Sequence, residues 1–367
     1  MTSASPVSSR NVPPDHRSVL IIDDSAVARS MIARMVDASH RYAVAGSVAN
    51  VDAAFAFLMR ARIDVILLDL EMPGVSGLTA LPDLITAGRG AKILVVSAST
   101  SDGASATVQA LALGAADTLV KPGVQTTSSR FAELLSERLD RLFDPPALVV
   151  PKVASADVEP KLSAAPARPT SAASGRGTFD VVAIGASTGG IHALSLLLRE
   201  LPASFSAPIL ITQHLPATFM SHFAAQLAVL GGRPCEVATD YMRIRPGRIV
   251  VAPGDHHMKV VALTDGAAIR LVDDPVASGC LPSIDPMFES IAEVFGARAL
   301  GIVLSGMGRD GSTGAVRLHQ AGGAVVAQDV ASSVVWGMPG AAVATGVVSA
   351  TMPPDAIGRL IAARPKP

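Results

Sequence analysis

Three residues that could carry out acyl transfer, Ser187, His214 and Asp310, each follow a short apolar run. Such runs are typical of buried parallel strands. In an open parallel sheet, ligands bind beyond the carboxyl ends of the strands. The sequence therefore predicts a serine, a histidine and an aspartate at one sheet edge, which is the set needed for nucleophilic acyl transfer.

The segment around Ser187, residues 185–189, fits G-x-S-x-G, a tight strand-to-helix turn that presents a nucleophilic serine. At a helix N-terminus the backbone N–H groups and the helix dipole favour a developing anion. A glycine-rich turn of this kind also cradles phosphates, so the motif alone leaves a nucleotide-binding or non-catalytic module open. The spacing is not G-x-G-x-x-G, and His214 rather than an acid closes the next strand, which favours the nucleophile.

His214 suits a general base because it ends a predicted strand, and Asp310 would orient its ring and stabilise the imidazolium. The competing interpretation of Asp310 is a turn-forming Asp-Gly pair. The chain order Ser, His, Asp differs from the Ser, Asp, His order of α/β-hydrolases, which predicts a differently wound sheet. The other histidines are expected in the tail, the first domain, helices or a loop: His16, His40, His192, His222, His319 and the pair His256-His257.

A second group of polar residues ends the strands expected near the N-terminus. Clustered carboxylates suit Mg²⁺, and a lysine with a hydroxyl can neutralise a phosphoryl group that an aspartate accepts. The alternative is that two of the aspartates only cap the following helix. Polar residues at three further strand ends favour the phosphoryl site. The group consists of Asp23, Asp24, Asp69, Ser97 and Lys121.

Through these residues and Pro122, residues 18 to about 140 resemble a response-regulator receiver domain. The resemblance implies that Asp69 accepts the phosphoryl group and that Lys121 contacts the phosphate. One departure is Thr118, where such domains often carry an aromatic residue. The resemblance assigns the Mg²⁺ to Asp23, Asp24 and Asp69, and the switch to Ser97 and Lys121.

Alternation of apolar runs with helix-like stretches predicts two α/β domains. The first is expected to be a (βα)5, flavodoxin-like receiver with strands at 19–22, 42–47, 65–68, 93–96 and 118–120. The second is expected to be doubly wound and mostly parallel, with an antiparallel hairpin of 248–252 and 267–272 around a turn at 264–266. The predicted parts are a disordered tail 1–17, the receiver domain 18–141, a Pro/Ala-rich linker 142–177 and a catalytic domain 178–364.

Residues 178 to about 363 resemble the catalytic domain of chemotaxis protein-glutamate methylesterases, and the whole chain resembles that family. The resemblance implies hydrolysis of glutamate γ-methyl esters on chemoreceptors to glutamate and methanol, and deamidation of particular receptor glutamines in many members. It makes Ser187 the nucleophile, His214 the base, Asp310 the orienting acid and the Met307 N–H the oxyanion donor. Residues 277–282 lack the arginine or histidine frequent there in the family. The matching stretches are 184–190, 211–216, 252–258, 282–285, 305–311 and 335–339.

The resemblance further implies receptor cytoplasmic domains as substrate, a chemotaxis histidine kinase as phosphodonor, Mg²⁺ for phosphorylation and no cofactor for hydrolysis. A net charge of −1 gives no electrostatic case for nucleic acid, and a transcriptional regulator would need a basic recognition helix. No apolar stretch approaches a membrane span, and no signal-peptide core begins the chain, so a cytoplasmic protein is expected. Cys235 and Cys280 lack metal-type spacing and are expected to be buried free thiols.

Overall fold

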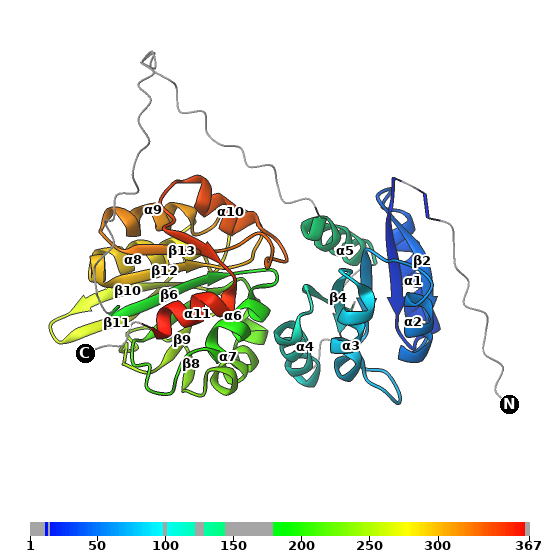
Figure 1. The fold of residues 1–367 in the computed structure, drawn as a ribbon, viewed down its shortest axis with the longest axis horizontal. Helices are drawn as coiled ribbons and strands as arrows, with labels where there is room; N and C mark the ends of the chain where they lie inside the picture. The colour runs from blue at the N-terminus through cyan, green and yellow to red at the C-terminus, as the bar shows by residue number, and fades with distance from the viewer. Residues whose placement is uncertain (1–11, 14, 98–100, 122–127, 144–178, 364–367) are drawn as a thin grey trace, which may run out of the picture.

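The computed structural model describes residues 12–13, 15–97, 101–121, 128–143 and 179–363. Residues 144–177 of the predicted linker, most of the predicted tail, and Pro122 lie outside the described residues, whereas residues 142 and 143 belong to helix α5. Figure 1 shows two α/β domains, with helix α4 of the first facing helices α6 and α7 of the second. Within the described ranges, no helix is long and apolar enough to cross a membrane.

The first domain is a five-stranded parallel sheet in the order β2-β1-β3-β4-β5, which confirms the flavodoxin-like prediction. Its strands are buried apolar runs because helices cover both faces. Strand β3 has the predicted bounds, and the bounds of the other four strands differ from the predicted ones by one or two residues. The strands are β1 (Arg17–Ile22), β2 (Tyr42–Val48), β3 (Val65–Leu68), β4 (Lys92–Ser97) and β5 (Asp117–Val120), and the helices are α1 (Ala26–Asp37), α2 (Val51–Leu58), α3 (Gly77–Gly88), α4 (Ser101–Leu113) and α5 (Ser128–Phe143).

The second domain is a seven-stranded parallel sheet in the order β14-β13-β12-β6-β7-β9-β8. The chain winds outward from β6 in both directions, so the switch point lies between β6 and β12, where ligands collect. One face is covered by α6, α7 and α11, and the other by α8, α9 and α10. The strands are β6 (Val181–Ala186), β7 (Ile209–Gln213), β8 (Cys235–Val237), β9 (Ile249–Val251), β12 (Ala299–Val303), β13 (Ala324–Gln328) and β14 (Ala350–Met352), and the helices are α6 (Gly190–Arg199), α7 (Ala217–Gly231), α8 (Ile284–Phe295), α9 (Ser312–Gln320), α10 (Gly337–Ala344) and α11 (Pro354–Ala362).

An antiparallel hairpin is present, but its first arm was predicted wrongly. The hairpin pairs β10 (His257–Leu263) with β11 (Gly266–Val272), around the predicted turn. The predicted first arm, 248–252, contains β9, which pairs in parallel with β7 and β8. The physical reason is burial: β9 is apolar and buried throughout, as a central parallel strand must be. His257, predicted in a loop, begins β10 and is buried.

Candidate active site

Ser187 and His214 follow the ends of adjacent strands. Ala186 of β6 pairs with Gln213 of β7, and the His214 N–H donates to the Ala186 carbonyl at 3.1 Å. On the other side of β6 lies β12, and the Ser187 N–H donates to the carbonyl of Ser305 at 3.0 Å. The pairing of β6 with β7 therefore brings the predicted nucleophile and base together, and the switch point between β6 and β12 lies on the other side of Ser187.

The serine turn is built from glycines because nothing larger fits. Gly189 has φ +75°, and a Cβ there would lie 2.5 Å from the Cβ of Val334. A Cβ on Gly190 would lie 2.6 Å from the Cβ of Ala186. The turn is closed by the Ser187 carbonyl, which accepts from the Gly190 N–H at 2.8 Å. The predicted strand-turn-helix context of G-x-S-x-G is thus present.

His214 and Asp310 form the predicted pair. Nε2 of His214 lies 2.8 Å from Oδ2 of Asp310, whose side chain is buried. Burial acts to lower the pKa of His214. The hydrogen bond to Asp310 and the neighbouring Cys280 outweigh it and raise that pKa to about 9. This contact favours the orienting role of Asp310 over a plain turn residue, since a buried carboxylate bound to imidazole stabilises the imidazolium.

The carboxylate of Asp310 is itself held by the N-terminus of helix α8. Ser283 donates its hydroxyl to Oδ1 at 2.6 Å, and the Ile284 N–H donates to Oδ2 at 2.8 Å. Burial acts to raise the pKa of Asp310, but the hydrogen bonds from His214, Ser283 and Ile284 lower it. Asp310 therefore stays ionised, and the hydrogen bonds from His214, Ser283 and Ile284 fix its orientation.

A second histidine, His257, contacts Ser283 and so supports Asp310 indirectly. Nδ1 of His257 accepts the Ser283 N–H at 2.9 Å, and its Nε2 lies 3.0 Å from the carbonyl of Asp274. These two partners require the neutral ring with its proton on Nε2. Sequence reasoning missed both His257 and Ser283 as supports. The only signal was that they lie in the stretches 252–258 and 282–285 that carry the family resemblance.

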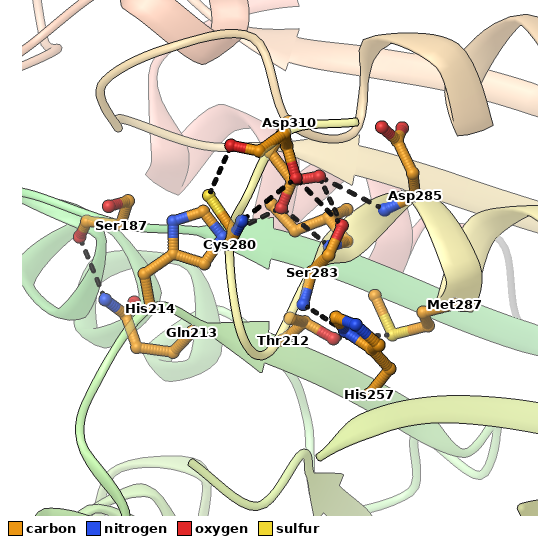
Figure 2. Close-up of polar contacts among 12 residues, drawn as sticks. Ser187, Thr212, Gln213, His214, His257, Cys280, Ser283, Asp285, Met287 and Asp310 are labelled. Atoms are coloured by element: carbon orange, nitrogen blue, oxygen red, sulfur yellow. Dashed lines mark hydrogen bonds and ion pairs between the residues drawn. The ribbon is translucent and has the colours of Figure 1, made fainter. Parts of the chain in front are cut away.

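Ser187 lies on the side of the His214 ring away from Asp310 (Figure 2). Within the described residues no hydrogen bond joins its hydroxyl to His214, and such catalytic bonds are often long before substrate binds. Ser187, His214 and Met307 line one cavity of about 470 Å³. The Met307 N–H makes no hydrogen bond to the described residues, and its role as oxyanion donor stays a prediction.

Cys280 lies at the same cavity, which sequence reasoning did not anticipate. Ligand atoms of Cys280, His214 and Asp310 lie within 4.8 Å of one another. Both cysteines are free, as expected, but each is half-buried rather than buried. Figure 2 shows the sulfur of Cys280 beside the His214 ring.

The predicted acidic pocket of the receiver is also assembled. Lys121 Nζ lies 2.7 Å from Oδ2 of Asp69 and 2.9 Å from Oδ2 of Asp23, both of which are buried. Burial raises the pKa of Asp69 despite the lysine. Burial acts to lower the pKa of Lys121, but the two carboxylates raise it. Ser97 Oγ lies 2.8 Å from the hydroxyl of Thr107 in α4.

The capping alternative for the two leading aspartates is not what the structure shows. Helix α1 is capped by Ser25, whose hydroxyl accepts the Ala28 N–H. Oxygens of Asp23, Asp24 and Asp69 lie within 4.8 Å of one another. Three carboxylates face one lysine, so an all-oxygen donor set with excess negative charge is present, and such a set fits Mg²⁺.

The receiver contacts the catalytic domain beside the nucleophile. The hydroxyl of Thr188 donates to Oδ2 of Asp117 at 3.1 Å, and the Gly189 N–H donates to the Ala116 carbonyl at 3.1 Å. The receiver residues Asp117, Arg138 and Arg141 line the cavity that holds Ser187. Asp117 begins β5, so the contact lies at the opposite strand end from Lys121. Neither Asp117 nor Ala116 was predicted from the sequence to contact the catalytic domain.

Comparisons with known proteins match both domains of the chain. A family model described as CheB methylesterase matches residues 182–361, and one described as response regulator receiver domain matches residues 19–128. A protein-glutamate methylesterase/protein-glutamine glutaminase 1 of Paramagnetospirillum magneticum is 39% identical over 357 residues, 92% of this chain and 93% of that protein.

A protein-glutamate methylesterase/protein-glutamine glutaminase 2 of Caulobacter vibrioides is 40% identical over 349 residues, 94% of this chain and 98% of that protein. Among solved structures, the catalytic domain of Thermotoga maritima CheB methylesterase is 30% identical and covers 51% of this chain and 98% of that chain, with a TM-score of 0.49.

Proposed function

Because this chain belongs to the CheB methylesterase family and carries a response regulator receiver domain, we propose that it hydrolyses γ-methyl esters of glutamate on chemoreceptors and releases methanol. The observation that carries the proposal is the bond of 2.8 Å between His214 and Asp310, beside a serine in a G-x-S-x-G turn. Nucleophile, base and orienting acid come from three adjacent strand ends, as acyl transfer requires.

In this mechanism the Ser187 hydroxyl attacks the ester carbonyl and His214 accepts its proton. Since Nε2 of His214 is bound to Asp310, the nitrogen left for that proton is Nδ1. The carbonyl oxygen gains negative charge, which the Met307 N–H stabilises. His214 then protonates the departing methanol, and water releases glutamate from the acyl-serine by the reverse sequence of proton transfers.

The same site serves deamidation of receptor glutamines. Attack on a carboxamide carbon forms the same acyl-serine, with ammonia in place of methanol as the leaving group. Amides are poorer acyl donors, so the general acid contributes more when His214 protonates the nitrogen. Support for this second activity comes from relatives named protein-glutamine glutaminase.

The test is release of labelled methanol from receptor membranes that carry methyl-labelled glutamate esters. The full chain is assayed with and without acetyl phosphate and Mg²⁺, and Ser187→Ala is the matched blank. We expect release that depends on Ser187 and rises with the phosphodonor. A folded chain that releases no methanol under either condition contradicts the proposal.

Labelling with a serine-directed phosphonate separates an esterase from a nucleotide-binding module with an inert serine. A hydrolase should lose activity in step with covalent attachment to Ser187. Attachment should be slowed by His214→Ala, because the base activates the hydroxyl. Nucleotide-dependent protection without any labelling would favour the module.

We also propose control by phosphorylation of Asp69, with a chemotaxis histidine kinase as phosphodonor. Asp23, Asp24 and Asp69 would hold the Mg²⁺, which offsets the charge of the carboxylates and the incoming phosphoryl group. Helix α4 links the two sites. At the middle of this helix the Thr107 hydroxyl donates to that of Ser97, and near its end the Ala112 carbonyl accepts from Ser195 at 3.2 Å.

Phosphorylation draws Ser97 toward the phosphate and so displaces α4, which packs against α6 and α7. The receiver contact beside Ser187 is then weakened, and the cavity becomes accessible to a receptor helix. Partners under this proposal are receptor cytoplasmic domains and the kinase, and neither requires nucleic acid.

A further inference from the structure

The strongest unassigned feature is a mixed donor cluster at the mouth of the catalytic cavity. One ligand atom each of His214, Cys280 and Asp310 lies within 4.8 Å of the others. The three residues come from the end of β7, the loop before α8 and the loop after β12 (Figure 2). They supply an imidazole nitrogen, a sulfur and a carboxylate oxygen. The proposed hydrolysis uses His214 and Asp310 but has no role for the sulfur of Cys280.

We propose that this cluster is an inhibitory binding site for a divalent transition metal of the Zn²⁺ class. Zn²⁺ takes nitrogen, thiolate and carboxylate ligands at about 2.0–2.3 Å in a tetrahedron, which places neighbouring ligand atoms about 3.3–3.6 Å apart. The distances between the three ligand atoms, all within 4.8 Å, can reach about 3.3–3.6 Å through small side-chain movements. His214 and Asp310, at 2.8 Å, must separate by roughly half an ångström.

The protein environment favours the ion in two ways. Asp310 is already held by Ser283 and Ile284, so one ligand is fixed before the metal arrives. Cys280 and His214 both line the cavity of about 470 Å³, which gives the ion an entry path. Three protein ligands leave the fourth tetrahedral position to water.

The chemistry separates this site from the receiver pocket. Within the described residues, the second cluster of possible ligands is Asp23, Asp24 and Asp69, which offers oxygen only. Thiolate and imidazole select Zn²⁺-class ions, whereas carboxylates suit Mg²⁺. One chain thus carries a hard-ion site in the receiver and a softer site at the esterase.

The functional consequence rests on the proposed function. A metal bound to the His214 nitrogen and to Asp310 removes the base and its orienting acid together, so hydrolysis stops while the metal is bound. Metal binding itself does not depend on hydrolysis, and the two can be measured separately.

The binding test is titration of the full chain with Co²⁺ in saturating Mg²⁺, which fills the receiver pocket. We expect one Co²⁺ per chain with a thiolate-to-cobalt charge-transfer band and the visible absorption of tetrahedral cobalt, both removed by Zn²⁺. Cys280→Ser should lose the charge-transfer band, and the matched control Cys235→Ser should keep it. Absence of the band, or its survival in Cys280→Ser, overturns the site.

The activity test is reversible inhibition of methanol release by Zn²⁺, with recovery on adding a chelator. Loss of a supporting residue alone costs about 10–100-fold in metal affinity, so Cys280→Ser should raise the inhibition constant by roughly 100-fold relative to Cys235→Ser. Equal inhibition of the two variants overturns the inhibitory role. If the band depends on Cys280 but Zn²⁺ does not inhibit methanol release, the metal site stands and its inhibitory role is overturned.

Discussion

Asp310 binds His214 through the same oxygen that caps a helix: Oδ2 lies 2.8 Å from Nε2 of His214 and accepts the Ile284 N–H at 2.8 Å. The substitution Asp310→Asn keeps the shape and one acceptor oxygen for the helix. It presents an amide N–H or oxygen that favours the wrong histidine tautomer. We expect kcat for methanol release to fall by roughly 10⁴-fold.

The measurement is single-substrate kinetics on phosphorylated protein, with thermal unfolding as the check on folding. Asp265→Asn is the matched control, because Asp265 is exposed at the hairpin turn and forms an ion pair with Arg243, far from the catalytic residues in the sheet. A loss of only a few-fold in Asp310→Asn would show that Asp310 is a turn and capping residue rather than the orienting acid.

Ser187→Ala should abolish methanol release and leave the fold intact. The described contacts of Ser187 come from its backbone, whose N–H donates to Ser305 and whose carbonyl accepts from Gln213. Removing the hydroxyl therefore removes no hydrogen bond of the turn. Ser221→Ala, an exposed position on α7, is the control. The assignment is refuted by near-normal release from a folded Ser187→Ala chain.

Cys280→Ala should move the pH dependence of kcat/KM in a defined direction. Burial lowers the pKa of His214, but Asp310 and Cys280 raise it to about 9, so the base is mostly protonated at neutral pH. Activity should rise as pH increases through that pKa. Removing Cys280 removes one of the groups that raise the pKa, so the ascending limb should shift to lower pH.

The profile is measured on the unphosphorylated full chain without added metal, and Cys235→Ala is the control. Cys235 lies in β8, away from the cavity, and should leave the limb where it is. A limb that stays in place or moves upward in Cys280→Ala would mean that the thiol does not act on His214.

Most of the candidate active site could be predicted because its residues follow the ends of recognisable strands. Ser187, His214 and Asp310 follow apolar runs, and parallel strands bring their carboxyl ends to one edge whatever their order in the chain. The first arm of the hairpin was predicted wrongly because β9 and the true arm β10 are both short, mostly apolar runs. The two differ in burial: β9 is buried throughout, as a strand inside the main sheet must be, and β10 is only partly buried.

What could not be predicted depends on contacts between loops. Cys280 reaches His214 from a loop 66 positions on in the chain, a separation that no periodicity encodes. The support from His257 through Ser283 likewise needs the hairpin and α8 to be packed together first. The receiver contact at Asp117 depends on how two separate domains dock, which neither domain's pattern specifies.

The last prediction concerns the contact between Thr188 of the catalytic domain and Asp117 of the receiver. The Thr188 hydroxyl donates to Asp117, and Arg138 holds the same carboxylate at 3.0 Å. Asp117→Ala removes a buried hydrogen bond between the domains, worth about 1 kcal/mol, which is roughly a fivefold shift toward the undocked chain. The unphosphorylated full chain should therefore release methanol about fivefold faster. Asp140→Ala is the matched control, because Asp140 lies on the same helix as Arg138 and pairs with Arg41 inside the receiver.

Two further variants give the highest and the lowest rates of methanol release expected from undocking the receiver. A chain that begins near Gly175 lacks the receiver and should be active without any phosphodonor, which gives the ceiling for release. Asp69→Asn should stay at the basal rate with acetyl phosphate and Mg²⁺, because it has no phosphoacceptor. Combining Asp69→Asn with Asp117→Ala should restore activity without phosphorylation, since docking rather than the phosphate controls access. If the unphosphorylated full chain is already as fast as the chain without the receiver, the contact at Thr188 does not inhibit, and the receiver acts by localisation or by direct activation instead.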